Sequence, residues 1–546
     1  MTTTTDTTFA PPGKGQWMSL RDHFPRAVTP EYALLLPAAM AAGEAIPFAT
    51  YGLPVKTLSV GLVQGHVYVT PEPLMGRASN SLPPWPFLWL AARLVPAFRA
   101  RTRAARRALA ERPWLAEAEH WYAVERDEWR ATNAALQAED PTAMDPDALI
   151  DHLRRVRAHA GAGYERHFSL HGPDLIPTGL LLARAEDWGL PAAAVLPVLA
   201  GSSPASTGAG PTLDALRAAV ARSGSAPTSV DDLRRIAPAE LDAFLAEHSW
   251  RLTTGYDLDA ESLGELPALI VHLARSPGRR PADDAAGADP ALDELRSLVP
   301  ATHRCELDRL VADARATFGM RDDNGGLTGA WPMGLLRRAM LTAGRRLADA
   351  GALEQAEHAI EVTVDELCSL LAGAASPDGP MVADRAARRV ARSALVPPAQ
   401  LGPTLDVPLR ALPGPMRLVS HAQLALRDSF ASAGAERPEL AGDGVGVGSY
   451  QGRACVASDS GDALARLEPG DVLIALGTTP AFNMALSIAG AVVVEEGGLL
   501  SHAAVIAREL GLPAVIGAVG ATGQVPDGAL VEVDAVAGQV RVLAVP

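Results

Sequence analysis

The pattern of apolar and polar positions divides the chain into a long helical part and a shorter part in which strands alternate with helices. From about residue 84 to residue 371, apolar residues recur with the period of an amphipathic helix. After Gly448 the pattern changes to short apolar runs typical of buried strands. The expected strands are Gln451–Ala457, Val472–Leu476, Ala491–Val494, Ala514–Ile516, Leu530–Asp534 and Gln539–Leu543, with a helix over Pro480–Ala489. The sequence thus predicts an α+β multidomain protein.

Glycine and proline set the predicted ends of the elements in the helical part. Val55–Leu62 and His66–Thr70 flank Gly65 and predict a hairpin. Asp147–His159 predicts an amphipathic helix that ends at Gly161 and Gly163. Loops are expected over 200–211 and 277–289. Further helices are predicted from Thr212 onward and at Pro238–Ser249, Ala268–Arg275, Asp293–Thr317, Leu335–Ala350 and Thr363–Ala372.

Clusters of glycine and proline also indicate the domain boundaries. Residues 1–12 are expected to be a disordered tail and residues 13–373 a mainly helical domain. Residues 374–439 are rich in proline and glycine around helices at Val382–Ser393 and Met416–Ser429, a composition typical of a hinge. Residues 440–546 are then a compact domain of ordinary size.

One stretch, Gly497–Gly517, carries the clearest candidate chemistry. It follows a predicted strand, and Ser501 is a suitable N-cap for a helix that begins at His502 and ends at Gly511. His502 therefore lies in a first helical turn, where free N–H groups and the helix dipole favour an anion. A phosphate on its imidazole would be stabilised there, although a lone histidine at a helix start more often only packs.

This stretch resembles the phosphohistidine loop of the swivelling domain of the phosphoenolpyruvate-utilising enzymes, which include phosphoenolpyruvate synthase, pyruvate phosphate dikinase and rifampicin phosphotransferase. The resemblance implies that His502 is the phosphorylated histidine, in a β/β/α domain, and that Ser501, Arg508 and Gly498 help to bind the phosphate. It also places a phosphate-binding threonine on Thr478, with Thr479 as the other candidate, and plain helix capping is the alternative role. Dikinases often have threonine where this chain has Leu500, so regulation through that position is not expected. The matching residues are Gly497, Gly498, Ser501, His502, Ala503, Ala504, Ala507, Arg508, Gly511, Pro513 and Gly517.

The helical part resembles, more diffusely, the substrate domain of rifampicin phosphotransferase and its relatives. The similar segments are Gln16–Pro30, Phe244–Asp257 and Arg321–Asn324. The resemblance implies site roles for the residues His248, Arg251, Arg321 and Asp322.

These residues fit a phosphoryl-transfer site and a purely structural role. A histidine and an arginine three apart on a helix share one face. An arginine beside a carboxylate, as at Arg321 and Asp322, has the parts that bind a phosphoryl group and accept a proton, but a structural ion pair would look the same. His167 and His171 have a spacing that metal sites use, yet no third ligand follows at a known spacing, so we expect pocket lining or surface and no metal site.

Composition limits the partners. The net charge of −15 argues against nucleic-acid and anionic-membrane binding, and no apolar stretch is long enough to span a membrane without a charge or proline. The first residues lack the pattern of a signal peptide. Three distant cysteines fit a reducing compartment, so a cytoplasmic protein is expected.

The donor of a phosphoryl group is not recognisable in the sequence, which has no GxxxxGK[ST] motif and no segment resembling an ATP-grasp domain. A chain with the histidine loop but no recognisable ATP-binding domain resembles the histidine-bearing subunit of phenylphosphate synthase and of 4-methylphenyl phosphate synthase. This resemblance implies a separate ATP-grasp subunit that binds ATP and Mg²⁺, a covalent phosphohistidine intermediate, and a phenol or alkylphenol such as p-cresol as acceptor. A rifampicin-like antibiotic is the alternative acceptor. A different class of function is also an alternative, in which the chain is a non-catalytic phosphocarrier or signalling module.

Overall fold

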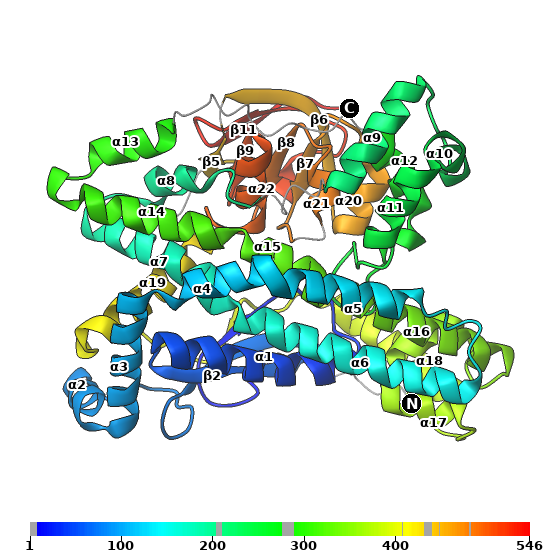
Figure 1. Ribbon diagram of the computed structural model, residues 1–546, viewed down its shortest axis with the longest axis horizontal. Helices are drawn as coiled ribbons and strands as arrows, with labels where there is room; N and C mark the ends of the chain where they lie inside the picture. The colour runs from blue at the N-terminus through cyan, green and yellow to red at the C-terminus, as the bar shows by residue number, and fades with distance from the viewer. Residues whose placement is uncertain are drawn as a thin grey trace.

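A computed structural model describes residues 8–203, 210–275, 289–406, 408–430, 439–446, 448–479 and 482–546. A helical body, drawn blue to yellow-green in the lower part of Figure 1, contains most of the chain. A β/α domain made from the last hundred residues lies above it, beside the helices α9 to α12. The structure is an α+β multidomain protein, as the sequence predicts.

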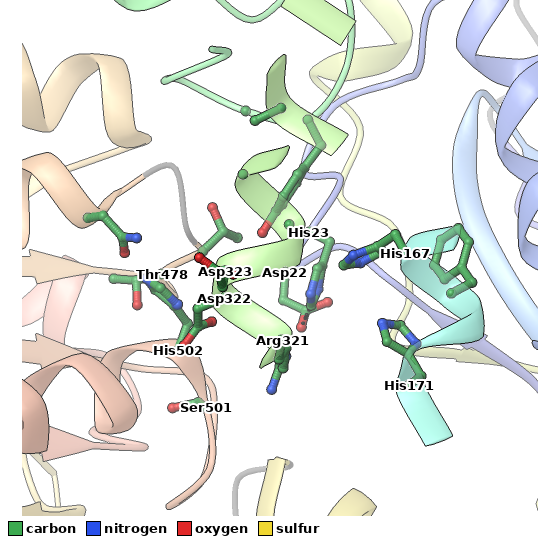
Figure 2. A pocket seen from close by; sticks show the side chains of 18 of the residues that line it. Asp22, His23, His167, His171, Arg321, Asp322, Asp323, Thr478, Ser501 and His502 are labelled. Atoms are coloured by element: carbon green, nitrogen blue, oxygen red, sulfur yellow. Dashed lines mark ion pairs between the residues drawn. The ribbon is translucent and has the colours of Figure 1, made fainter. Parts of the chain in front are cut away.

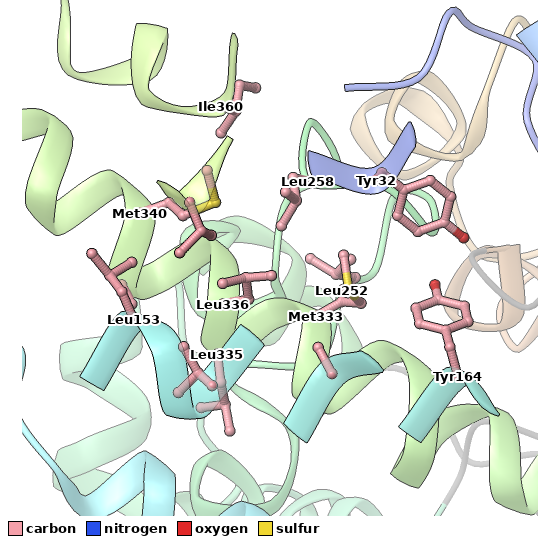
Figure 3. Close-up of a cluster of buried hydrophobic side chains, with 14 of the residues drawn as sticks. Tyr32, Leu153, Tyr164, Leu252, Leu258, Met333, Leu335, Leu336, Met340 and Ile360 are labelled. Atoms are coloured by element: carbon pink, nitrogen blue, oxygen red, sulfur yellow. The ribbon is translucent and has the colours of Figure 1, made fainter. Parts of the chain in front are cut away.

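Three long helices form the centre of the helical body. α1 (Pro30–Tyr51) packs along α6 (Pro146–Ser169), and α16 (Trp331–Asp349) packs on α6 from another side. Figure 3 shows part of the apolar core between them, where Leu153 of α6 meets Leu335, Leu336 and Met340 of α16. Burial of these large side chains contributes most of the stability of such a body, at about 1.5–3 kcal/mol for each.

The predicted end of α6 at Gly161 and Gly163 is wrong, because the helix continues to Ser169. Tertiary packing overrides the low helix propensity of glycine here. A Cβ atom on Gly163 would lie 2.1 Å from the carbonyl oxygen of Thr328, which belongs to the π-helical turn Gly325–Ala330. Gly163 therefore allows a close approach of two backbones instead of ending the helix.

A small sheet closes one side of the helical body. The predicted hairpin is confirmed as β2 (Val55–Val63) and β3 (His66–Pro73). Two short strands that the sequence did not indicate, β1 (Trp17–Ser19) and β4 (Gln400–Leu401), complete the order β2-β3-β1-β4. Met18 pairs with Val69 on one side and Gln400 on the other, so this sheet joins distant parts of the chain.

Among the described residues, α1 is long and apolar enough to cross a membrane by length and composition alone. In the structure it is a core helix, with Tyr32 and Leu36 fully buried. Its buried carboxylates are paired, because Glu31 accepts a hydrogen bond from Arg157 at 2.6 Å and Glu44 bonds to His171 at 2.8 Å. A buried polar group needs such partners.

The remaining helices mostly follow the predicted positions. The predicted helix over Asp293–Thr317 is divided at Pro300 into two helices, because a residue that precedes proline favours an extended backbone, which Val299 adopts. The helices predicted within the hinge also pack on the helical body: Val419, Ala422 and Leu426 are buried in the same core cluster as Leu180. These helices are α2 (Trp85–Leu94), α3 (Pro96–Glu111), α4 (Pro113–His120), α5 (Arg126–Ala138), α7 (His171–Asp187), α8 (Ala192–Val195), α9 (Pro211–Ser223), α10 (Val230–Ile236), α11 (Pro238–His248), α12 (Pro267–Arg275), α13 (Pro290–Leu298), α14 (Arg304–Phe318), α15 (Met320–Asn324), α17 (Val364–Leu371), α18 (Gly379–Ser393) and α19 (Gly414–Phe430).

The β/α domain is built on a seven-stranded sheet of order β11-β10-β6-β7-β8-β9-β5. Its four central strands, β6 to β9, run parallel, and their side chains are buried in two core clusters on the two faces. All six predicted strands are present, and β5 was not predicted. The strands are β5 (Asp443–Val445), β6 (Ser449–Ala457), β7 (Val472–Ala475), β8 (Ala491–Val494), β9 (Ala514–Ile516), β10 (Leu530–Asp534) and β11 (Gln539–Ala544), and the helices are α20 (Ser460–Arg466), α21 (Asn483–Leu486), α22 (His502–Leu510) and α23 (Ala521–Gln524).

Several expectations fall partly outside the described residues. These are the tail, the loop over 200–211, the loop over 277–289, and the end of the hinge, with residues 1–7, 204–209, 276–288 and 431–438 not described. Phe9, within the predicted tail, packs against His66 with ring centroids 5.9 Å apart. The predicted helix over Pro480–Ala489 is shorter in its described part, where α21 covers Asn483–Leu486.

Candidate active site

A cavity of about 1640 Å³ lies between the helical body and the β/α domain. The helical body contributes the segment around His23, the junction of α6 and α7, the segment after α11, and α15 (Figure 2). The β/α domain contributes the loop around Thr478 after β7 and the segment from Glu495 to His502. In parallel α/β sheets, ligands bind at the carboxyl ends of the strands, and both β/α segments follow such ends.

His502 lies at the start of α22, as predicted, and faces this cavity. It is 9% exposed, and its Nε2 atom has no hydrogen-bond partner among the described residues. Burial lowers the pKa of His502 well below its usual value, and Arg321 and His23 lower it further. The imidazole is therefore neutral at physiological pH, and a neutral imidazole keeps a free lone pair on one ring nitrogen, which a nucleophile or phosphoryl carrier requires.

Three other polar side chains near the start of α22 and α21 lack partners within the described structure. Ser501 occupies the N-cap position but its hydroxyl does not cap the helix. Its Oγ atom, Oγ1 of Thr478 and Oδ1 of Asn483 are buried and unpaired, and all three residues line the cavity with His502. Each unpaired buried polar group costs about 1–3 kcal/mol. Hydroxyl donors, an amide and free helix N–H groups gathered around one imidazole fit a bound phosphoryl group.

Arg321 and Asp322 project from α15 into the same cavity (Figure 2). Asp322 accepts a hydrogen bond from the hydroxyl of Ser203 at 2.7 Å. Burial raises the pKa of Asp322, while Arg321 opposes that shift. A carboxylate with a raised pKa is a better proton acceptor than an exposed one, and the guanidinium beside it provides positive charge for phosphoryl oxygens.

His248 and Arg251 also line the cavity, but not from one helical face as predicted. α11 ends at His248, so Arg251 lies in the segment that follows. The Nε2 atom of His248 shares a hydrogen bond with the Thr212 hydroxyl at 3.2 Å. Arg251 donates to Glu247 at 3.1 Å and lies over the Trp331 ring, 5.0 Å from its centroid. Burial lowers the pKa of both His248 and Arg251.

Arg508 and Gly498 do not line the cavity. The guanidinium of Arg508 donates instead to the carbonyl oxygen of Leu499 at 2.6 Å, and its pKa is lowered to about 10 by burial. The carbonyl of Gly498 accepts the N–H of Ser501 at 2.9 Å, which shapes the turn before α22. In this arrangement both residues hold the turn that precedes His502.

The far end of the cavity is lined by His167 and His171 (Figure 2), whose spacing had left a metal site and pocket lining as alternatives. His167 bonds through Nδ1 to Oδ1 of Asn324 at 2.5 Å, and His171 bonds through Nδ1 to Glu44. Burial lowers the pKa of each histidine to about 3 and raises that of Glu44 to about 8. Neutral imidazoles with fixed Nδ1 contacts are therefore part of the cavity wall.

Aromatic side chains form much of the remaining wall. Phe24, Tyr32, Tyr164, Phe168 and Tyr256 all line the cavity. Tyr256 stacks on His23 with ring centroids 5.8 Å apart. Small-molecule sites commonly combine such an apolar lining with a few polar groups.

Contacts between the two bodies hold His502 at this cavity. Glu509 of α22 accepts hydrogen bonds from the backbone N–H groups of Gly201 and Ser203, each at 3.1 Å. Arg21 forms an ion pair with Glu496. The N–H of Leu500 donates to the carbonyl of Ser429 at 2.8 Å. The roles of Glu509 and Asn483 had no signal in the sequence, because their partners are distant along the chain.

Comparison with known proteins finds matches to part of the chain. Residues 467–538 match the family model described as PEP-utilising enzyme, mobile domain. An uncharacterised protein of Mycobacterium tuberculosis is 35% identical over 38% of this chain and 22% of its own length. Rifampicin phosphotransferase of Streptomyces sviceus is 33% identical over 38% of this chain and 21% of its own, and phosphoenolpyruvate synthase of Aeropyrum pernix is 44% identical over 17% and 11%.

Residues 467–538, which include the helix that begins at His502, are therefore similar to the mobile domain of the PEP-utilising enzymes. The matched segments span about a fifth of the length of the mycobacterial and Streptomyces relatives.

Proposed function

We propose that this chain is the histidine-bearing component of an ATP-dependent phosphotransferase that phosphorylates a hydroxyl group of an organic molecule held in the cavity. The observation that carries the proposal is the neutral imidazole of His502, whose Nε2 atom has no hydrogen-bond partner among the described residues, in a cavity that Arg321 and Asp322 also line. The match of residues 467–538 to the mobile domain of the PEP-utilising enzymes and the similarity to a rifampicin phosphotransferase support it.

In the first half-reaction, Nε2 of His502 attacks the β-phosphorus of ATP. A P–N bond forms and the bond from the β-phosphorus to the oxygen of AMP breaks, which leaves a pyrophosphoryl group on His502. Water then attacks the γ-phosphorus, the bond from the γ-phosphorus to the bridging oxygen breaks, and phosphate leaves. ATP and Mg²⁺ would be bound by a separate ATP-grasp subunit, the arrangement implied by the resemblance to phenylphosphate synthase. Such a reaction fits the cytoplasm, where ATP is available. A mobile histidine domain lets one imidazole serve two distant sites.

In the second half-reaction, the acceptor oxygen attacks the phosphohistidine. The O–P bond forms, the N–P bond breaks, and His502 returns to a neutral imidazole. Asp322 takes the proton of the hydroxyl, and Arg321 stabilises charge on the phosphoryl oxygens. The structure has His502 at the cavity of the helical body, and we interpret this arrangement as the one for transfer to the acceptor.

For the acceptor we propose an aryl hydroxyl, such as phenol or p-cresol. The aromatic wall supports this class, and a phenol gives up its proton more readily than an alcohol. The size of the cavity, about 1640 Å³, supports the alternative of a larger molecule such as a rifampicin-like antibiotic, because it exceeds the volume of about 300–1,000 Å³ that is usual for small-molecule pockets. An open cavity beside His502 does not support a carrier with no small-molecule reaction.

The two half-reactions can be tested separately. Phosphoramidate phosphorylates histidine chemically, so it would load His502 without any partner. The loaded chain is then mixed with phenol, p-cresol or rifampicin, and phosphate transfer is followed by mass spectrometry. We expect one acceptor to receive phosphate at a rate that depends on Asp322. Loss of phosphate only to water with every acceptor would contradict acceptor phosphorylation.

The first half-reaction, in which ATP phosphorylates His502, is tested with ATP labelled in the β-phosphoryl group and candidate ATP-grasp subunits. We expect acid-labile label on the wild-type chain and none on His502→Ala. Label that appears on His502→Ala as well would contradict the assignment of the histidine.

A further inference from the structure

The helix α2 exposes an unusual number of large apolar side chains. Trp85, Phe87, Trp89, Leu90 and Leu94 are 47%, 67%, 42%, 47% and 64% exposed. Ala92 is the residue of this helix that is buried. The apolar side chains are thus exposed around most of the helix instead of along one buried stripe, and a patch of this kind marks an interaction site.

Positive charge surrounds this helix. Between Glu72 and Glu111 the sequence contains seven arginines and no aspartate or glutamate, so the other residues carry a net charge of −15 − 7 = −22. Arg99, Arg103, Arg106 and Arg107 of the adjacent helix α3 are exposed, and the described structure contains no ion pair for them. The chain is therefore strongly segregated by charge, with one basic corner on an acidic protein.

The aromatic rings and the arginines of this corner are in direct contact. The guanidinium of Arg93 lies 4.0 Å from the centroid of the Trp89 ring, and that of Arg410 lies 5.2 Å from the centroid of Trp85. Tryptophan, phenylalanine and leucine beside arginine are the composition of helices that lie in the interface of a membrane. There the apolar side chains enter the acyl boundary and the guanidinium groups bind lipid phosphates.

We propose that α2 and α3 form a peripheral membrane-binding site for anionic lipid surfaces. Lipid can cover an apolar helix from several sides, whereas a globular partner covers one face. A second copy of this chain fits less well, because two-fold symmetry would bring the two arginine clusters together. The acidic remainder of the chain is repelled by an anionic surface, so only this corner approaches it.

A membrane bound at α2 and α3 would leave the β/α domain, which carries His502, uncovered. Figure 1 shows α2 and α3 at a lower corner of the molecule, with the β/α domain at the top. The expectation of no membrane binding was based on net charge, which averages over the whole chain and hides the basic corner. This inference does not depend on the proposed phosphotransfer, and its test uses no activity.

The test is co-sedimentation of the full chain with vesicles of phosphatidylcholine alone and of phosphatidylcholine with phosphatidylglycerol. We expect binding only to the vesicles with phosphatidylglycerol, and weaker binding at high salt because the lipid charge is screened. Arg103→Glu with Arg107→Glu should weaken binding by about tenfold or more, since each arginine near such a surface contributes about 1 kcal/mol. Trp85→Ser with Phe87→Ser should also weaken it. All four side chains are exposed, so folding should be unaffected.

Two controls make the result specific. Arg154→Glu with Arg222→Glu reverses two arginines that are also exposed but lie outside α2 and α3, and should not change binding. Lipids with brominated chains should quench tryptophan fluorescence, and Trp85→Phe with Trp89→Phe should remove the quenching while binding persists. The proposal is overturned if vesicles without phosphatidylglycerol bind equally well, if no vesicle binds, or if light scattering shows a dimer that the α2 variants dissociate.

Discussion

Glu509 and Ser203 connect the β/α domain to the helical body. The Glu509 carboxylate accepts the Ser203 N–H at 3.1 Å, and it also accepts the N–H of Gly201. Ser203 in turn donates its hydroxyl to Asp322. One short segment of the helical body thus contacts both the helix that carries His502 and the carboxylate proposed to accept the proton.

Docking of the mobile domain should depend on pH through Glu509. Burial raises the pKa of Glu509 from 4.5 to about 7 in the docked arrangement. A group with a raised pKa stabilises the arrangement at low pH and loses that contribution as pH rises through its docked pKa. We expect the docked fraction, measured by fluorescence energy transfer between the two bodies, to fall as pH rises from 5 to 8. Glu509→Gln should remove this dependence, and an unchanged pH profile in that variant would contradict the assignment.

Asp322→Asn should slow transfer to the acceptor but not the loading of His502. Loss of a general base typically costs about 10²–10⁴ in rate. Burial raises the pKa of Asp322, so the transfer rate should increase as pH rises through that pKa and then level off. The decay of chemically loaded phosphohistidine with acceptor present measures this rate. Asp323→Asn is the matched control, because Asp323 lines the same cavity but accepts a hydrogen bond from Trp121 at 2.9 Å.

Thr478→Val should leave the stability of the unphosphorylated protein unchanged or increase it. The threonine hydroxyl is buried without a partner among the described residues, so its removal breaks no hydrogen bond there. The same change should reduce the lifetime of phosphorylated His502, because a donor to the phosphate is lost. Thermal unfolding and phosphate release measure the two effects. A variant that is less stable before phosphorylation would indicate a structural role only.

Gly163→Ala should destabilise the helical body by about 1–3 kcal/mol, the usual cost of overpacking. Its Cβ would lie 2.1 Å from the Thr328 carbonyl oxygen, and backbone cannot easily move away. Gly161→Ala is the matched control in the same helix, where the nearest atom is 3.6 Å away on a Leu35 side chain. It should stabilise by about 0.5–1 kcal/mol. Urea unfolding curves distinguish the two, and equal effects would contradict the packing.

The sequence predicted the position of His502 because strand, N-cap, helix and terminal glycine are all local features. It also indicated the cavity residues on α15. It did not predict Glu509 or Asn483 as part of the site, because their contacts depend on how α22 and α21 dock. The wrong end of α6 has the same origin: Gly163 is in a helix interior because Thr328 is close to it in space. The short strands β1 and β4 depend on pairing between residues nearly four hundred positions apart.

The role of His502 is tested most directly by identifying which histidine becomes phosphorylated chemically. The full chain is treated with phosphoramidate at neutral pH and digested, and phosphorylated histidine peptides are identified by mass spectrometry. We predict acid-labile phosphate on His502 ahead of the other histidines, retained in His248→Ala and absent in His502→Ala. Phosphate spread over exposed histidines, with His502 unmodified, would contradict the claim that this imidazole carries the phosphoryl group.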